Sequence, residues 1–139
     1  MTEQEIIKKY EYMFEYMKDE KVHYPIRYGF ACDDGWLPLL EILFKGMAEL
    51  DTQKAVRIFQ IKEKCGGLRF YIEFQSKNLL GEEYTNKIYD LISKAESASY
   101  NICERCGASP AKQTSKGWIK TLCSKCLGEK DEEQNGTSQ

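Results

Sequence analysis

Four cysteines near the end of the chain constrain its fold more than any other feature. They form two Cys-x2-Cys pairs separated by sixteen residues: Cys103, Cys106, Cys123 and Cys126. This spacing is typical of four-cysteine zinc sites, in which each short pair supplies two thiolates to the same ion. Gly107, directly after the first pair, suits a tight turn because glycine tolerates positive φ. We therefore predict one structural Zn²⁺ bound by these cysteines in a zinc ribbon.

The alternative for the two pairs is redox activity or disulfide formation. Redox pairs lie at the start of a helix beside a strand, and the context here does not match. The N-terminus contains acidic residues and no apolar run, unlike a signal peptide, and no segment approaches the ~18 apolar residues of a membrane span. The sequence thus predicts a cytoplasmic protein without membrane association, in which clustered cysteines bind metal more often than they form disulfides.

The rest of the chain has the composition of a globular domain. Of its 139 residues 42% are hydrophobic, and the formal net charge of −2 creates no overall positive field that would attract nucleic acid. We predict an α+β domain over residues 1–100, the zinc ribbon over 101–126 and a disordered polar tail over 127–139. Of the two remaining cysteines, Cys65 is expected to be a small buried residue and Cys32 a loop thiol.

The apolar periodicity of helices occurs in three segments, residues 3–19, 35–51 and 82–100. Thr2 and Glu5 fit a capping box at the start of the first segment. Asp33 or Asp34 can cap the second segment. Pro38 is compatible with that helix because it falls in the first turn, where its missing N–H has no partner to lose.

The stretch from residue 55 to 75 predicts a β-hairpin. Gly66-Gly67 is the expected turn, so Cys65 faces Leu68 and Lys62 faces Tyr71. One face is then apolar apart from Glu63, with Phe59, Ile61, Cys65, Leu68, Phe70, Ile72 and Phe74. The other face is polar, with Gln60, Lys62, Lys64, Arg69, Tyr71 and Glu73. We expect the three helices to pack on this small antiparallel sheet, which a short strand from residues 22–32 could extend.

The polar face of the predicted hairpin is a candidate ligand site. Lys62, Lys64 and Arg69 come together across the two strands beside Tyr71, and like charges at neighbouring positions cost stability unless something offsets them. An anionic ligand would do so, because Arg69 could donate two hydrogen bonds to a phosphate and Tyr71 could stack on a base. The alternative is a solvated face whose lysines and arginine are balanced by the glutamates of the two strands.

A second basic cluster lies in the ribbon and consists of Lys112, Lys116, Lys120 and Lys125. Ribbons with exposed basic and aromatic residues often contact nucleic acid or protein. Trp118 is expected instead to fold over the metal and to dock the ribbon on the third helix. The role of the lysines stays open at this point.

Catalytic residues have little support in the sequence. His23 is the only histidine, so a Cys–His or Ser–His nucleophile would depend on it alone. The usual phosphate-binding glycine loops are absent, and helix capping explains Asp33 and Asp34. A four-thiolate zinc shell leaves no coordination position for water. We expect a protein that is not an enzyme.

Three segments together resemble those of a known family: Gly-Trp-Leu-Pro-Leu-Leu at 35–40, Gln-Ile-Lys-Glu-Lys-Cys-Gly-Gly-Leu-Arg-Phe-Tyr at 60–71 and Gly-Trp-Ile-Lys-Thr-Leu-Cys at 117–123. Over about residues 24–126 the chain is similar to uncharacterised small proteins of bacteriophages, prophages and bacterial genomes, in which a GGLRFY-type hairpin precedes a short zinc ribbon. In that family the position of Cys65 is often Phe. The resemblance implies a phage-type accessory protein in the cytoplasm of a bacterial host, and it implies no particular reaction.

Phage accessory proteins often block host enzymes or sequester host signalling nucleotides. We therefore expect a zinc-containing binding protein that modulates a host process, such as antiviral defence, by binding a host protein or an anionic ligand through Lys62, Lys64, Arg69 and Tyr71. One alternative is a nucleotide-sequestering anti-defence protein, which requires an enclosed pocket at an oligomer interface. The other is a nucleic-acid-binding ribbon that uses the second basic cluster.

Overall fold

The computed structural model describes residues 1–75 and 79–128. Its elements, in chain order, are α1 (Glu3–Lys9), the 3-10 helices η1 (Glu11–Lys18), η2 (Pro25–Tyr28) and η3 (Asp34–Trp36), α2 (Leu37–Leu50), β1 (Val56–Lys64), β2 (Gly67–Phe74), α3 (Glu82–Ser99), β3 (Lys112–Gln113) and β4 (Thr121–Leu122). A last helical turn covers residues 124–128, so the predicted tail begins inside it, and residues 129–139 lie outside the described residues. The predicted α+β class, with helices on an antiparallel hairpin and a cysteine cluster near the C-terminal end, is confirmed.

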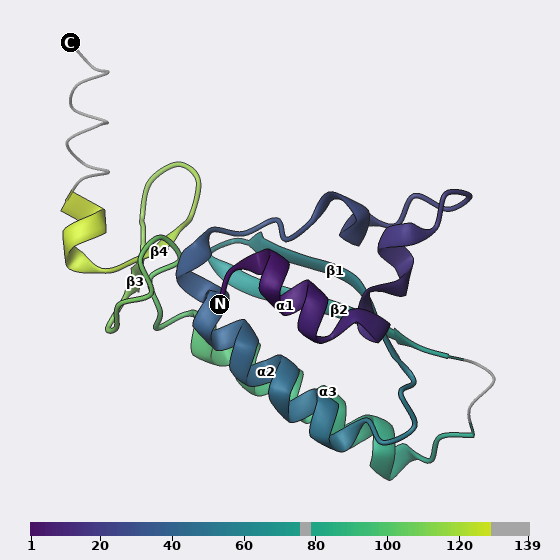
Figure 1. Ribbon diagram of the computed structural model, residues 1–139. Coiled ribbons are helices and arrows are strands. Elements are labelled where there is room, and N and C mark those ends of the chain that lie inside the picture. Colours follow the sequence, from purple (N-terminus) through teal and green to yellow (C-terminus); the bar gives the residue numbers. More distant parts are fainter. Residues whose placement is uncertain (76–78, 129–139) are drawn as a thin grey trace.

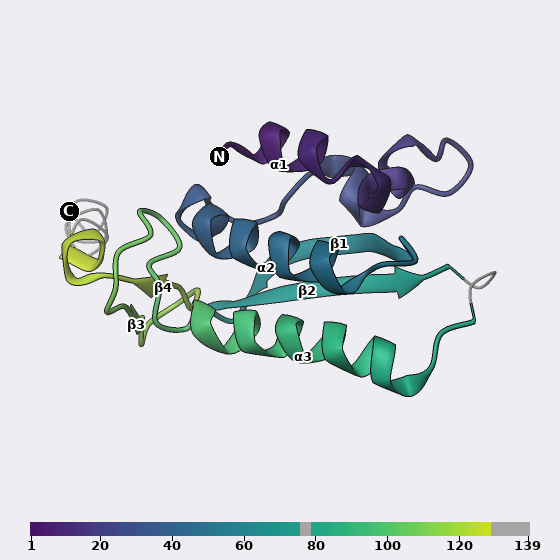
Figure 2. The same ribbon diagram turned by 60° about the horizontal axis from the view of Figure 1, so that its bottom comes forward.

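The hairpin of β1 and β2 lies among the helices of the main domain (Figures 1 and 2). The helices α2 and α3 pack against each other, α3 runs along β2, and η1 and η2 lie against β1. Aromatic rings fill the space between them, with Phe44 stacked on Tyr10 and edge-on to Phe70. None of the described helices combines the length and the apolar character needed to cross a membrane.

The first helical segment is broken rather than continuous over residues 3–19. It begins with the predicted capping box, in which the Thr2 hydroxyl accepts a hydrogen bond from the Glu5 N–H at 3.2 Å. After α1 the chain continues as a 3-10 helix with irregular backbone at Phe14 (φ −102°, ψ 23°). The irregularity lets the consecutive side chains of Met13 and Phe14 both be buried, although a regular helix separates neighbours by about 100°. The apolar residues of the segment thus face the core, but the predicted single helix over residues 3–19 is wrong.

The aspartates before the second helix do not cap it through their side chains. Pro38 lies in the first turn of α2 as predicted, but a short 3-10 helix precedes it. Asp33 stands at the N-cap of η3 and Trp36 at that of α2, and neither side chain makes a capping hydrogen bond. The capping prediction was wrong because the backbone N–H groups of Asp33 and Gly35 donate hydrogen bonds to Glu104 of the ribbon instead.

The hairpin is present, but its turn lies one residue earlier than predicted. Lys64 pairs with Gly67, so the turn consists of Cys65 and Gly66, with φ values of +53° and +84°. Two consecutive positive φ values match the type I′ turn, the common two-residue connection of hairpins. Gly67 belongs to β2, where a Cβ atom would lie 2.3 Å from the Tyr100 ring. Cys65 is consequently exposed, and its predicted burial is wrong.

A β-bulge at Phe59 changes which side chains of β1 enter the core. The register shifts between Ile58 and Gln60, so Ile58 and Ile61 are both buried. Phe59, predicted on the apolar face, is half-buried and lines the opposite surface. The other strand positions keep their predicted faces, because a register error of two residues preserves the alternation. We call the face opposite Ile58 and Ile61 the outer face; its residues are Phe59, Gln60, Lys62, Lys64, Arg69, Tyr71 and Glu73.

Polar groups from neighbouring segments cover both edges of the hairpin. Ala31 forms two backbone hydrogen bonds with β1, of 2.9 and 3.0 Å, and this single parallel bridge is all that remains of the predicted third strand. On the other edge α3 supplies the acceptors: the Leu68 N–H donates to the Ser99 hydroxyl, and the Phe70 N–H to the Glu96 carboxylate, both at 2.9 Å. Unpaired edge groups recruit additional strands, so these contacts protect the hairpin from edge pairing.

A buried carboxylate joins the helices to the start of β1. Asp51 is 2% exposed and accepts hydrogen bonds from the Ala55 and Val56 N–H groups, both at 2.9 Å, and from the Tyr12 hydroxyl at 2.7 Å. The Tyr84 hydroxyl of α3 donates to the same carboxylate. Burial and the Asp51 carboxylate raise the pKa of Tyr12 and of Tyr84, so both hydroxyls remain donors.

We predict that Cys65→Asn stabilises the protein. An L-residue in the left-handed region costs roughly 1–2 kcal/mol, and asparagine tolerates this region better than cysteine, so we expect a gain of about 0.5 kcal/mol in the free energy of unfolding. Urea denaturation of the metal-loaded protein measures the gain. Cys65→Ala is the control, because it removes the thiol and keeps the strain. A less stable Cys65→Asn variant would contradict the observed turn.

Candidate metal centre and its junction with the hairpin

The ribbon lies at one end of the molecule, where β3 and β4 are labelled in Figure 1, and its four cysteines converge on one another. Their Sγ atoms lie within 4.8 Å of one another, and those of Cys106 and Cys123 are 3.6 Å apart. A disulfide would place two sulfurs at about 2.05 Å. A tetrahedral shell with metal–sulfur bonds of about 2.3 Å separates its sulfurs by about 3.8 Å. The cluster therefore fits a four-thiolate metal shell and could hold a metal ion.

Backbone hydrogen bonds shape both cysteine pairs. The Gly107 N–H donates to the Cys103 carbonyl, and the Cys103 N–H donates to the Ala108 carbonyl, both at 2.8 Å. Gly107 has the predicted positive φ, +85°. In the second pair the Leu127 N–H donates to the Cys123 carbonyl at 2.8 Å as the last helical turn begins. Each pair thus presents its thiols from a closed turn of backbone.

The thiols of the cluster differ in how readily they ionise. Burial raises the pKa of Cys103, but backbone hydrogen bonds at Cys123, Cys106 and Arg105 outweigh this effect and lower that pKa to about 6. Burial, together with hydrogen bonds to the other three thiols, raises the pKa of Cys126 to about 12. One thiolate forms readily, whereas four neighbouring thiolates repel one another. A divalent cation offsets this repulsion, because it replaces the protons with positive charge.

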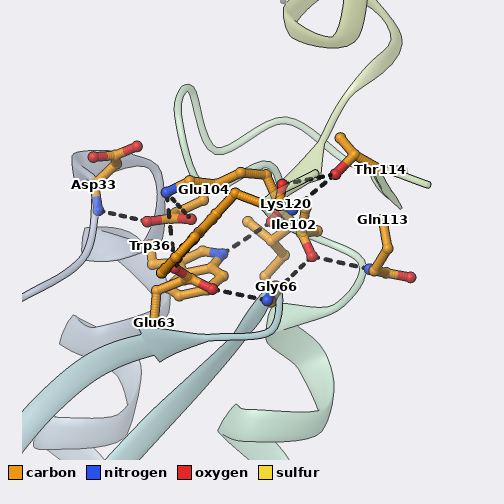
Figure 3. A network of polar contacts seen from close by, with 11 residues as sticks. Asp33, Trp36, Glu63, Gly66, Ile102, Glu104, Gln113, Thr114 and Lys120 are labelled. Atoms are coloured by element: carbon orange, nitrogen blue, oxygen red, sulfur yellow. Dashed lines mark hydrogen bonds and ion pairs between the residues drawn. The ribbon is translucent and has the colours of Figure 1, made fainter. Parts of the chain in front are cut away.

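Glu104, the first of the two residues between Cys103 and Cys106, joins the ribbon to the main domain (Figure 3). Glu104 is 1% exposed, and its carboxylate accepts hydrogen bonds from the Asp33 N–H at 2.9 Å and from the Lys120 ammonium at 3.3 Å. Its backbone carbonyl accepts from the Gly35 N–H at 2.7 Å. The sequence gives little signal for this role. A glutamate next to a cysteine ligand is expected to be exposed to solvent, and its partner Asp33 lies 71 positions away in the sequence.

Gly35 and Trp36 form the surface of the main domain on which the ribbon rests. A Cβ atom at Gly35 would lie 2.3 Å from the carbonyl oxygens of both Cys103 and Glu104. Trp36 is fully buried, and its indole N–H donates to the Ile102 carbonyl at 2.9 Å. The Gly-Trp pair was predicted only as the start of a helix, and it is also the docking element for the ribbon.

The turn of the hairpin contacts the same ribbon. The fully buried Thr121 donates its hydroxyl hydrogen bond to the Gly66 carbonyl. Glu63 accepts from the Gly66 N–H at 2.8 Å and lies 3.9 Å from the Lys120 ammonium. Lys120 is therefore shared by two carboxylates, Glu63 from the hairpin and Glu104 from the ribbon (Figure 3). The contact with Lys120 explains why a charged residue, Glu63, lies on the otherwise apolar face of the hairpin.

The aromatic and basic residues of the ribbon lie differently from their predicted places. Trp118 does not fold over the cysteines: its side chain is 75% exposed, and its indole N–H points to Glu63 at 3.4 Å. Lys120 lies between the carboxylates of Glu63 and Glu104 and helps to join the ribbon to the hairpin. The other lysines of the cluster are exposed: Lys112, Lys116 and Lys125.

The predicted ligand residues of the hairpin are only partly brought together. Lys62, Lys64 and Tyr71 line an open depression of about 380 Å³ on the outer face, with Phe59, Gln60, Ile72 and Glu73. Arg69 does not line it, because its guanidinium donates to the Tyr100 hydroxyl at 3.1 Å. Arg69 thus holds β2 against the end of α3.

The remaining candidate residues are separate from one another. His23 is exposed between η1 and η2, and among the described residues none forms a hydrogen bond with its side chain. Cys32 packs against the main core, and burial raises the pKa of its thiol to about 12. Cys65 lies in the exposed turn of the hairpin. These positions give no assembled nucleophile and base.

Comparison of the chain with protein-family models, with curated protein sequences and with solved structures finds no match. Its function must therefore be inferred from its own residues.

We predict that Lys120→Met destabilises the metal-loaded protein by about 2 kcal/mol. Breaking a buried ion pair costs about 3–5 kcal/mol, and the partial exposure of Lys120 reduces this figure. Urea denaturation measures the effect. Lys116→Met, at an exposed lysine of the same loop, is the matched control and should change the free energy of unfolding by less than about 0.5 kcal/mol. Equal stability of the two variants would contradict the role of Lys120 in the junction.

Proposed function

We propose that this chain is a non-enzymatic binding protein with one structural zinc ion, and that the outer face of its hairpin binds an anionic ligand. We further propose that it is a phage-type accessory protein that acts in the bacterial cytoplasm on a host process such as antiviral defence. The sequence resemblance supports this second part.

The donor set of the cluster supports zinc. Four thiolates in a tetrahedral arrangement are the usual shell of structural Zn²⁺, and soft sulfur ligands disfavour the hard cations Mg²⁺ and Ca²⁺. Zinc would link the two halves of the ribbon and keep Glu104 facing the main domain. A shell closed by Cys103, Cys106, Cys123 and Cys126 offers no position for a reacting water, which supports a structural role.

The unpaired lysines of the outer face carry the proposal for ligand binding. Neither Lys62 nor Lys64 has a carboxylate within 4.0 Å in the part of the chain that is described, and Lys62 lies directly opposite Arg69. Glu63 does not balance them, because it points to the other side of the hairpin and meets Lys120. A row of like charges beside an open depression is less costly when an anion occupies it.

Native mass spectrometry of the chain, purified gently from a bacterial host, tests both parts of the proposal. We expect one zinc ion per chain and a copurified anionic partner. The partner should be lost from the Lys62→Glu/Lys64→Glu variant, because the charge of the outer face is reversed. It should remain on Lys87→Glu/Lys94→Glu, in which two exposed lysines of α3 receive the same change.

The outcomes of this experiment separate the proposed functions. A chain with iron in place of zinc, or without metal, would contradict the metal assignment. A partner that remains on the outer-face variant would contradict the ligand surface. A nucleotide-sized mass on a dimer would favour nucleotide sequestration instead, since an open depression encloses a small ligand only if a second copy covers it.

A further inference from the structure

We infer that the ligand of the outer face is single-stranded nucleic acid, with phosphates on Lys62 and Lys64 and a base stacked on Tyr71. This inference rests on the proposed function, because it names the ligand class of the same surface.

The two lysines form a line of positive charge along β1. They are two positions apart on one face of a strand, so their side chains leave the backbone about 6.6 Å apart. Such a line can follow an extended phosphate backbone, whereas a compact anion would use convergent donors. Arg69, which would have supplied a convergent donor opposite Lys62, is turned to Tyr100.

An aromatic ring lies beside the lysines with its surface available. Tyr71 is 43% exposed and faces Gln60 across the strands. Stacking on such a ring does not depend on base identity, because every base has a π face. The Gln60 amide adds one donor group and one acceptor for the edge of a stacked base.

The wall of the depression is already ordered by aromatic contacts. Phe59 lies edge-on to Tyr24, with ring centres 5.7 Å apart, and Tyr24 stacks on Tyr16 at 4.1 Å. The Tyr16 hydroxyl donates to Glu73 at 2.8 Å, which holds that carboxylate at the rim. A preformed wall reduces the conformational entropy that a ligand must remove on binding.

Other ligand classes fit this surface less well. A peptide that adds a strand needs a free sheet edge, and here Ala31 occupies one edge while Ser99 and Glu96 occupy amides of the other. A free nucleotide needs enclosure, and the depression is open. The open depression, and the row of two lysines that continues past Lys62 to Gln60 and Tyr71, favour a continuous strand.

Fluorescence anisotropy of the zinc-loaded full chain with labelled single-stranded DNA and RNA oligonucleotides tests the inference. Affinity should fall linearly with salt on logarithmic axes. The Lys62→Ala/Lys64→Ala variant should lower the slope by about 1.4, from two lost contacts of about 0.7 each. Tyr71→Ala should weaken binding about fivefold or more, and Tyr71→Phe, which keeps the ring, should retain the affinity.

Matched controls come from α3 on the other side of the hairpin. Lys87→Ala/Lys94→Ala removes the same charge from exposed positions, and Tyr89→Ala removes a ring that is 46% exposed, against 43% for Tyr71. Both controls should leave affinity and slope unchanged. Circular dichroism of each variant checks that the fold is retained.

Several results would overturn the inference. These are the absence of oligonucleotide binding at low salt, equal binding of free mononucleotides, or loss of binding through Lys112→Ala/Lys116→Ala rather than through the hairpin variants. If oligonucleotides fail while Lys62→Glu/Lys64→Glu still releases an acidic partner protein, only the ligand class is wrong. If the outer-face variants affect no ligand at all, the proposed function is wrong as well.

Discussion

A buried negative charge beside the metal ligands determines how the two parts of this protein fit together. The Glu104 carboxylate is removed from water, so it must receive hydrogen bonds and a cation. The Asp33 N–H and Lys120 supply them, and Lys120 also faces Glu63 of the hairpin. Because Glu104 directly follows Cys103, the geometry of the cysteine cluster fixes where these partners must lie.

The ribbon is therefore an integral support of the hairpin. The main domain contributes the Gly35 backbone to one side of the junction, and the hairpin turn contributes Gly66 to the other. The outer face begins at Lys64, directly before this turn. A metal ion that is remote from the proposed ligand would thus position the lysines that bind it. The proposed division of roles follows from these positions: the cysteine cluster would support the fold, and the open depression beside Lys62 and Lys64 would bind the ligand.

The sequence predicted what depends on local pattern and missed what depends on distant contacts. The cysteine spacing located the cysteine cluster, and the alternation on β2 located the hairpin, because both patterns are read from short segments. The turn was misplaced because Gly66-Gly67 looks like a better turn than Cys65-Gly66, and the Tyr100 ring that reserves the Gly67 position lies far along the chain. The roles of Glu104, Lys120 and Arg69 were missed for the same reason: an isolated charge in a sequence does not reveal whether its partner is water or a buried group.

Amide hydrogen exchange, before and after a chelator removes the metal, tests whether the contacts of the ribbon with the main domain and the hairpin depend on the metal. The Gly35 and Gly66 N–H groups, which donate to Glu104 and Glu63, should lose their protection together when the metal leaves. The Ala55 and Val56 N–H groups, which donate to Asp51, should keep theirs. Unchanged protection of Gly35 and Gly66 in the metal-free protein would contradict a role of the metal in holding the ribbon against the main domain and the hairpin.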